Sequence, residues 1–389
     1  MSPNPAACER IDSVTRVDLI YFEAGGGHRA AATALKLVIA EQQRPWDVRF
    51  VNLQEILDPM DIFRKLLGHR LQDIYNLLLR KGWTLGSSQL CTMMHAAIRT
   101  SHHQQVRLIE AQWRSSPPDL VVSLVPNFNR ALRESLKNVC PAAPFVTVLT
   151  DLADYPPHFW IERQEQFLVC GSDRAVEQAR KQGHAEDHIF RVSGMILHPR
   201  FYQPVTADRA VERRRLGLDP DRPTGLVMFG GEGAKAMLNI VRRLDRSTLD
   251  LQLILICGHN EGLAGQLREF QGRLPMFVEG FTTEVPYYMH LSDFFVGKPG
   301  PGSISEALAM KLPLIVQCNA WTLPQERYNT VWVRETETGL VLPGFHKIDE
   351  AVARLIAPAT LARYRANAAA MKNRAVFEVP DILERILAR

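Results

Sequence analysis

The chain has 389 residues, which is too many for a single hydrophobic core of ordinary size, so its length predicts two domains. Hydrophobic residues make up 46% and charged residues 23%, as in globular proteins, and no apolar run approaches the roughly 20 residues of a membrane-spanning helix. The net charge of +4 is compatible with an anionic membrane surface as a partner. Without a basic stripe and interleaved aromatic residues, it does not predict nucleic-acid binding.

The six cysteines are scattered, without a Cys-x-x-Cys pair or the spacing of zinc ligands. Several lie in apolar runs, where cysteine mostly packs as a small hydrophobic residue. The N-terminus carries Glu9 and Asp12 and lacks the apolar centre of a signal peptide. We therefore expect a reduced, cytoplasmic compartment, with the protein either soluble or bound to the inner face of the membrane.

Short apolar runs alternate with longer helical patterns, which predicts two doubly wound parallel α/β sheets. The expected strands are 17–22, 48–52, 120–124, 145–149 and 166–170 in the first half, and 225–229, 251–257, 276–278, 294–296 and 314–317 in the second. The turn-rich segment 198–204 is the expected linker. We therefore expect an N-terminal domain over 1–203 and a C-terminal domain that begins at 204.

The first predicted strand runs into a glycine loop, Gly25-Gly26-Gly27, which is followed by His28 and a helix. Glycines let the backbone approach a ligand closely, and the helix N-terminus offers free N–H groups to an anion. The loop also fits a dinucleotide-binding pattern, but that pattern needs an acidic residue where the second strand ends at Asn52. We expect His28 to be neutral and able to accept a proton, or else only to cap or pack the first helical turn.

Residues 60–81 place apolar side chains at helical spacing with basic residues between them, and a less periodic apolar stretch follows up to residue 95. A basic amphipathic helix can lie in a membrane interface. The alternative is a helix packed on the N-terminal sheet with a solvated basic face. Residues 60–95 are therefore a candidate membrane or acceptor segment.

Asp151 follows the fourth predicted strand. Because ligands of open α/β sheets bind beyond the carboxyl ends of the strands, we expect Asp151 to face a cleft. Three roles fit this position: a general base, a residue that orients His28, or an Asx turn without catalytic function.

The second half repeats the pattern of a strand that runs into glycines. One loop contains Gly231, Glu232 and Gly233, and a second junction runs from Lys298 to Ser303 and opens a helix suited to an anion. Glu306 lies three residues after Ser303, so it is either a ligand contact or the second half of a capping box. Lys298 is either an anion contact or a solvated lysine at the end of a strand.

Together these motifs resemble glycosyltransferase family 28. The matching segments are the Gly25-Gly26-Gly27-His28 loop, Thr150-Asp151-Leu152, Gly230-Gly231-Glu232-Gly233, Gly280-Phe281, the stretch from Lys298 to Leu308, and Pro324-Gln325-Glu326 with Asn329. Within the family the chain is most similar to the monogalactosyldiacylglycerol synthases and bacterial diacylglycerol glycosyltransferases. The resemblance implies a GT-B fold, in which two Rossmann-like domains face a cleft and a C-terminal helix, here within 373–389, crosses back from a C-terminal domain that ends at 372.

The resemblance also implies the site. It makes His28 the catalytic residue, with Asp151 as a second candidate, and places the acceptor-side loop at Gly25, Gly26 and Gly27. The implied donor-binding residues are Gly231, Glu232, Gly233, Gly300, Pro301, Gly302 and Ser303 around the diphosphate with Lys298, Phe281 at uracil, Glu306 at the ribose, and Gln325 and Glu326 at the hexose. Asn329 belongs to the same donor-binding set, without an assigned part of the donor.

The implied activity is inverting, metal-independent transfer of galactose or glucose from a UDP-sugar to diacylglycerol or a related lipid. UDP-hexose would be the co-substrate, and we expect no cofactor and no Asp-x-Asp motif to hold a metal ion. The alternatives are another acceptor or a UDP-sugar epimerase. The chain departs from the family pattern at 317–323, where the unusual Trp321 leaves the sugar and the acceptor open.

Overall fold

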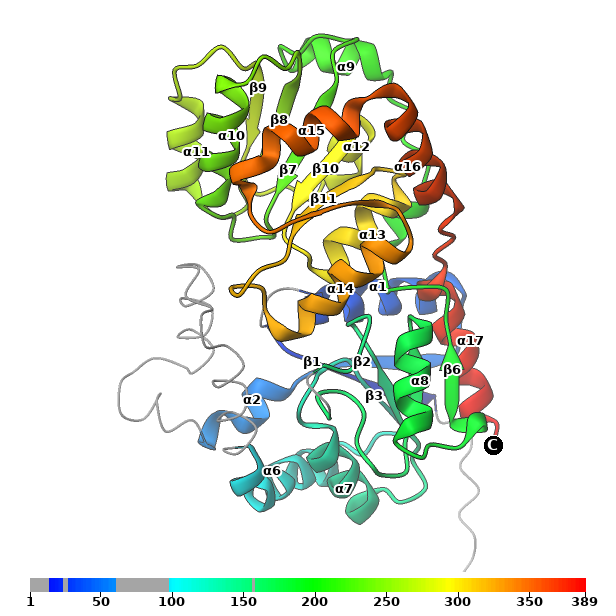
Figure 1. Ribbon diagram of the computed structural model, residues 1–389. Coiled ribbons are helices and arrows are strands. Elements are labelled where there is room, and N and C mark those ends of the chain that lie inside the picture. The colour runs from blue at the N-terminus through cyan, green and yellow to red at the C-terminus, as the bar shows by residue number, and fades with distance from the viewer. Residues whose placement is uncertain (1–13, 24–26, 61–97, 156–157) are drawn as a thin grey trace, which may run out of the picture.

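The computed structural model describes residues 14–23, 27–60, 98–155 and 158–389 and contains two parallel six-stranded sheets (Figure 1). The first sheet has the order β2-β1-β3-β4-β5-β6 and the second the order β12-β11-β10-β7-β8-β9. The second is the strand order of a Rossmann fold, and both confirm the predicted doubly wound architecture.

The strands of the first sheet are β1 (Thr15–Tyr21), β2 (Trp46–Asn52), β3 (Leu120–Ser123), β4 (Phe145–Val148), β5 (Phe167–Cys170) and β6 (Ile189–Arg191). Those of the second are β7 (Thr224–Met228), β8 (Gln252–Ile256), β9 (Met276–Glu279), β10 (Phe294–Gly297), β11 (Leu314–Gln317) and β12 (Gly339–Leu342). All ten predicted strands are present. The structure adds two strands that were not predicted, β6 and β12, which are short and lie at the edges of the sheets.

The α-helices that the structure describes are α1 (Gly27–Glu41), α2 (Leu53–Leu57), α6 (His102–Ser115), α7 (Asn129–Val139), α8 (Asp173–Lys181), α9 (Arg209–Arg215), α10 (Ala236–Arg246), α11 (Glu261–Arg268), α12 (Val285–His290), α13 (Pro301–Ala309), α14 (Pro324–Glu335), α15 (Ile348–Ile356), α16 (Pro358–Ala370) and α17 (Ala375–Leu387). Short 3-10 helices are η1 (Asp58–Met60), η2 (Glu186–His188), η3 (Pro199–Tyr202) and η4 (Phe345–Lys347).

Each sheet is buried between two helical layers, as its nearly continuous apolar strands require. Helices α10, α11 and α15 share a core with one face of the second sheet, and α12, α13 and α14 share a core with the other. In the first sheet, α6 and α7 cover one face and α1 covers the other. These layers leave the loops at the strand ends free to form a site.

The C-terminal helix α17 returns to the first sheet, as predicted, and lies along α1 (Figure 1). Its side chains Val376, Val379 and Leu383 are fully buried in the same core as Leu35 and Val38 of α1. Strand β1 and helix α17 therefore lie in the same half of the molecule, although they are at opposite ends of the described sequence. The predicted linker contains η3, and the domain limits 1–203, 204–372 and 373–389 stay a prediction.

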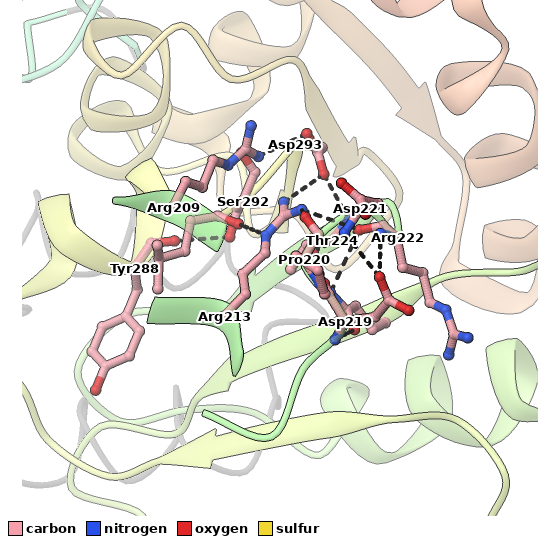
Figure 2. A network of polar contacts seen from close by, with 12 residues as sticks. Arg209, Arg213, Asp219, Pro220, Asp221, Arg222, Thr224, Tyr288, Ser292 and Asp293 are labelled. Atoms are coloured by element: carbon pink, nitrogen blue, oxygen red, sulfur yellow. Dashed lines mark hydrogen bonds and ion pairs between the residues drawn. The ribbon is translucent and has the colours of Figure 1, made fainter. Parts of the chain in front are cut away.

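A buried ion cluster fastens the start of the second domain to its sheet (Figure 2). The carboxylate of Asp293, just before β10, accepts hydrogen bonds from Arg209 (2.7 Å) and Arg213 (2.8 Å) of α9 and from Arg365 (2.5 Å) of α16. It also accepts one from the backbone N–H of Thr224, at the start of β7. This cluster lies at the amino edge of the sheet, opposite the loops that carry the predicted site.

The candidate membrane segment 60–95 lies, apart from its first residue, outside the described residues and stays a prediction. Within the described ranges, no helix combines the length and apolarity needed to cross a bilayer.

Candidate active site

The predicted site residues gather at the carboxyl edges of the two sheets. In the first sheet, His28 opens α1 after β1, and Thr150-Asp151 follow β4. In the second, the loop after β7 carries Gly231 and the loop after β10 carries Lys298. The strands β7 and β10 are neighbours at the point where the strand order reverses, which is where α/β sheets bind ligands.

His28 is held by groups at the ends of β3 and β4. Its Nδ1 atom lies 3.2 Å from Oγ1 of Thr150. Burial lowers the pKa of His28 to about 4, and a hydrogen bond to the carbonyl of Leu124 acts in the opposite direction. The imidazole is therefore neutral at physiological pH, as expected. Its described hydrogen-bond partners are Thr150 and Leu124 rather than Asp151, so the structure gives no support to Asp151 as its orienting residue.

Asp151 is buried against an indole ring. Its Oδ2 atom accepts a hydrogen bond of 2.9 Å from Nε1 of Trp160, which is itself fully buried. The ring of Trp160 also lies 6.0 Å from the ring of His28. Trp160 therefore contacts both catalytic candidates. Among the described residues, no backbone N–H donates to the Asp151 carboxylate as an Asx turn would require.

Charges from both domains act on Asp151. Burial raises the pKa of Asp151 to about 7, against the hydrogen bond from Trp160. Glu326 of the C-terminal half and neighbouring Asp154 raise this pKa further, whereas Lys298 lowers it. Asp151 therefore lies within electrostatic range of Lys298 and Glu326 from the other half of the chain. A carboxyl group with a pKa near 7 suits general base catalysis.

Lys298 connects the two glycine loops of the C-terminal sheet. Its Nζ atom lies 3.4 Å from Oε1 of Glu326, and its side chain is 44% exposed. A Cβ atom added at Gly230 or at Gly300 would lie 3.5 or 3.4 Å from Cε of Lys298. The lysine thus lies against both loops, and the ammonium group is placed where both could surround an anion. This geometry favours the anion contact over a solvated lysine.

A third loop, after β8, completes this edge and was missed in the sequence. The backbone N–H of His259 donates to the carbonyl of Gly231 at 2.7 Å. A Cβ atom at Gly258 would lie 2.1 Å from the same carbonyl oxygen, so the close approach requires glycine there. His259 stacks on Phe281 with ring centroids 4.1 Å apart. Phe281 is 56% exposed, which leaves one aromatic face open to a flat ligand.

The helix α13 begins at Pro301, with Gly300 as its N-cap, so Ser303 lies inside its first turn. The predicted capping box is absent, because no side chain caps this helix. Glu306 forms no hydrogen bond or ion pair with the described residues, and burial raises its pKa to about 7. A partly buried carboxyl without a protein partner is a suitable acceptor for ligand hydroxyl groups. Gly302 is exposed at the same helix end.

Helix α14 delivers the last predicted residues. Glu326 is 8% exposed and pairs with Lys298, and the Oε1 atom of Gln325 is buried without a partner among the described residues. Asn329 is fully buried and donates to the carbonyl of Pro299 at 2.8 Å. Asn329 therefore holds the loop before α13, and a contact with the donor stays a prediction.

The remaining predicted residues are less informative. Gly25 and Gly26 lie outside the described residues, and Gly27 is exposed at the start of α1. Glu232 is exposed, and its carbonyl accepts a hydrogen bond from Asn260. Asn52 caps α2 through the backbone N–H of Gln54, so the end of the second strand serves the fold, as expected if the dinucleotide pattern does not apply.

Contrary to the expectation from the sequence, the chain does contain an Asp-x-Asp motif, Asp219-Pro220-Asp221. Oδ1 of Asp219 accepts hydrogen bonds from the backbone N–H groups of Asp221 and Arg222 (Figure 2). The motif therefore forms a turn before β7, at the edge of the sheet opposite the site. In the parts of the chain that the structure describes, no group of three or more histidine, cysteine or acidic side chains could hold a metal ion.

The fold matches several solved structures along nearly the whole chain. It aligns with MurG of Acinetobacter baumannii (TM-score 0.60, 12% identity, 95% of this chain and 99% of that one) and with the calicheamicin glycosyltransferase CalG4 (TM-score 0.60, 17% identity, 97% and 99%). It also aligns with the Staphylococcus aureus MnaA-UDP co-structure (TM-score 0.61, 15% identity, 96% and 97%). The chain therefore has the GT-B fold, with two Rossmann-like halves.

The sequence defines the class further. Residues 225–386 match the glycosyltransferase family 28 C-terminal domain. The chloroplastic monogalactosyldiacylglycerol synthase of Spinacia oleracea is 28% identical over 362 residues, covering 89% of this chain and 67% of the relative. A probable monogalactosyldiacylglycerol synthase 2 of Oryza sativa subsp. japonica is 29% identical, covering 96% and 81%. Over residues 225–386 the chain is therefore similar to glycosyltransferase family 28. Together with its relatives along most of the chain, this makes the protein a glycosyltransferase.

Proposed function

We propose that the protein transfers a hexose from a UDP-sugar to diacylglycerol, or a closely related lipid, at a membrane surface. The observation that carries this proposal is the position of His28 and Asp151 opposite Lys298 and Glu326, because it pairs a proton acceptor with an anion-binding edge. The names of the relatives, which are monogalactosyldiacylglycerol synthases, support galactose and diacylglycerol as the first substrates to test.

On this proposal UDP lies along the carboxyl edge of the second sheet. Phe281 would stack on uracil, Glu306 would accept hydrogen bonds from the ribose hydroxyls, and Lys298 would contact the diphosphate. Backbone N–H groups of Gly302 and Ser303, in the first turn of α13, would add donors for the phosphate oxygens. Glu326 and Gln325 would contact the hexose.

The reaction would be a single displacement with inversion at the anomeric carbon. The acceptor hydroxyl would give its proton to Asp151 or His28 while its oxygen forms the new bond to that carbon. The bond from the same carbon to the β-phosphate oxygen would break, and its electron pair would leave with UDP. Lys298 and the α13 N-terminus would stabilise the charge that develops on the leaving diphosphate, and no cofactor takes part in these steps.

The direct test incubates the purified protein with UDP-galactose or UDP-glucose labelled in the sugar, with and without vesicles that contain diacylglycerol. We expect label in the lipid phase only when diacylglycerol is present, with one of the two sugars preferred. Label that never enters the lipid phase would contradict the proposal. Interconversion or hydrolysis of the UDP-sugar without lipid would favour an epimerase, and transfer to a water-soluble alcohol would favour another acceptor.

A further inference from the structure

A groove on the C-terminal half lies outside the predicted donor site. It has a volume of about 410 Å³, and its lining comes from α10, from Gln317 at the end of β11 and from η4. None of its lining residues belongs to the predicted donor set or to the cluster around His28. The groove is therefore a separate feature of the same domain.

The wall of this groove on α10 is strongly basic. Arg242, Arg243 and Arg246 line it, and exposed His346 lines it from η4. Arg242 and Arg246 are exposed and form no hydrogen bond or ion pair with any residue that the structure describes. They are four residues apart on one helix, a spacing at which like charges destabilise the helix. An anion between them would remove that repulsion.

The third arginine is held in place by the protein. Arg243 pairs with Oδ2 of Asp349 at 2.9 Å, and this bond lowers the pKa of Asp349, which therefore stays ionised. Of the other nearby acids, Asp245 accepts hydrogen bonds from the backbone N–H groups of residues 273 and 274, and Glu350 acts on Arg243 only at longer range. These acids leave the charges of Arg242 and Arg246 without a direct carboxylate partner.

The rest of the lining gives the groove a fixed shape. Phe345 is 7% exposed and packs edge-on against Phe229, with ring centroids 5.5 Å apart. Gln317 adds a neutral amide where β11 ends. The groove thus combines a rigid aromatic side, a hydrogen-bonding amide and a wall of guanidinium groups. Guanidinium groups bind phosphate oxygens through two parallel hydrogen bonds, so this combination suits a phosphate group.

We propose that this groove binds a phosphate-bearing ligand, with Arg242 and Arg246 contacting the phosphate oxygens and Arg243 fixed beside them by Asp349. The phosphate belongs either to a small soluble molecule or to the head group of an anionic phospholipid. The proposal does not depend on the proposed sugar transfer, because the two sets of residues do not overlap.

The test compares the full-length wild-type chain with the double variant R242Q/R246Q. Titration calorimetry in the presence of saturating UDP measures the affinity for inorganic phosphate, which represents a soluble ligand. Sedimentation measures binding to lipid vesicles. One set of vesicles contains phosphatidylcholine alone, and the other contains equal parts phosphatidylcholine and phosphatidylglycerol. The matched control is R214Q/R268Q, which removes the same charge from two exposed arginines on other helices of this domain. Thermal unfolding checks that both variants fold.

We expect R242Q/R246Q to weaken binding to one of the two probes by about tenfold or more, while R214Q/R268Q keeps the wild-type affinity. A loss of phosphate binding identifies a soluble ligand, and a loss confined to the phosphatidylglycerol vesicles identifies a lipid head group. The proposal is overturned if the wild-type chain binds neither probe, or if R242Q/R246Q binds both as tightly as the wild-type chain or the control.

Discussion

At the scale of single residues, the main feature of the candidate site is a buried carboxyl group whose pKa is affected by residues from both halves of the chain. Asp151 is bonded to Trp160 from its own half and is affected by Lys298 and Glu326 from the other. Because its pKa is about 7, small changes in its surroundings alter the fraction ionised at physiological pH. The ionisation of Asp151 should therefore respond to substitutions around it, whether Asp151 or His28 accepts the proton.

Replacement of Trp160 by phenylalanine should raise the pKa of Asp151, because the indole N–H stabilises the ionised form. If ionised Asp151 is the base, the acid limb of the kcat/KM profile should move to higher pH by about one unit, since hydrogen bonds to charged groups contribute about 1.5–3 kcal/mol. W332F, in a partly buried tryptophan of α14, is the control and should leave the limb in place. An unchanged limb in W160F would argue against Asp151 as the base.

Replacement of Glu326 by glutamine should have the opposite effect on the same limb. Removing a negative charge near Asp151 lowers its pKa, so the acid limb should move to lower pH, by about one unit, even if the maximal rate falls. E335Q, at the exposed end of the same helix, provides the comparison and should not shift the profile. If E326Q and E335Q gave the same profile, the two halves would not be coupled at Asp151 as described.

At the scale of elements, the Asp293 cluster explains how α9 and α16 are fixed to the second sheet. Burial alone would raise the pKa of Asp293, but Arg209, the Thr224 amide and Arg213 together hold it below its ordinary value. The carboxylate is thus more stable ionised in the folded chain than in the unfolded one. Its contribution is present above the unfolded pKa of 3.8 and is lost as the pH falls through the lower, folded value.

The substitution D293N should therefore destabilise the protein at neutral pH. Breaking a buried ion pair by removing one partner costs about 3–5 kcal/mol, since it leaves arginine charges uncompensated. Urea unfolding followed by circular dichroism would measure the change. D250N, whose carboxylate is 82% exposed and pairs with Arg222, should cost less than about 1 kcal/mol. Equal midpoints for the two variants would show that the cluster contributes little.

The predictable part of the fold was the part with strong local signals. Apolar runs bounded by turns identified ten of the twelve strands, including the edge strands β2 and β9, and the glycine loops marked the strand ends that carry the candidate site. Strand β6 is too short to give a pattern, and the apolar run at 340–342 in β12 was not recognised as a strand. Ser303 and Glu306 have capping-box spacing, yet α13 begins two residues earlier at Pro301, because proline fixes the first helical φ.

Trp160 and His259 could not be predicted from the sequence, and the physical reason is the same for both. Trp160 lies nine positions after Asp151 in an irregular segment, and only the folded chain brings its indole to that carboxylate. His259 was overlooked for the same reason, although the glycine before it marked a strand end like the other loops. Local pattern locates strand ends, whereas contacts between different loops depend on strand order in the sheet, which the sequence does not state.

At the scale of the whole molecule, the carboxyl edges of two similar sheets face one another, and α17 returns the chain to the half where it began (Figure 1). On the proposed function, this arrangement divides the chemistry, with the proton acceptor on the N-terminal half and the anion contacts on the C-terminal half. The basic groove on α10 lies on the C-terminal half as well, and its lining shares no residue with the predicted donor set.

The central claim is that the N-terminal half carries the chemistry while the C-terminal half holds the nucleotide. The most direct test measures both properties in H28A, with H103A, an exposed histidine of α6, as the control. Transfer by H28A should fall by about 10²–10⁴-fold, while its Kd for UDP stays within roughly twofold of the wild-type value. H28A with near wild-type transfer, or with UDP binding lost together with activity, would contradict this division of roles.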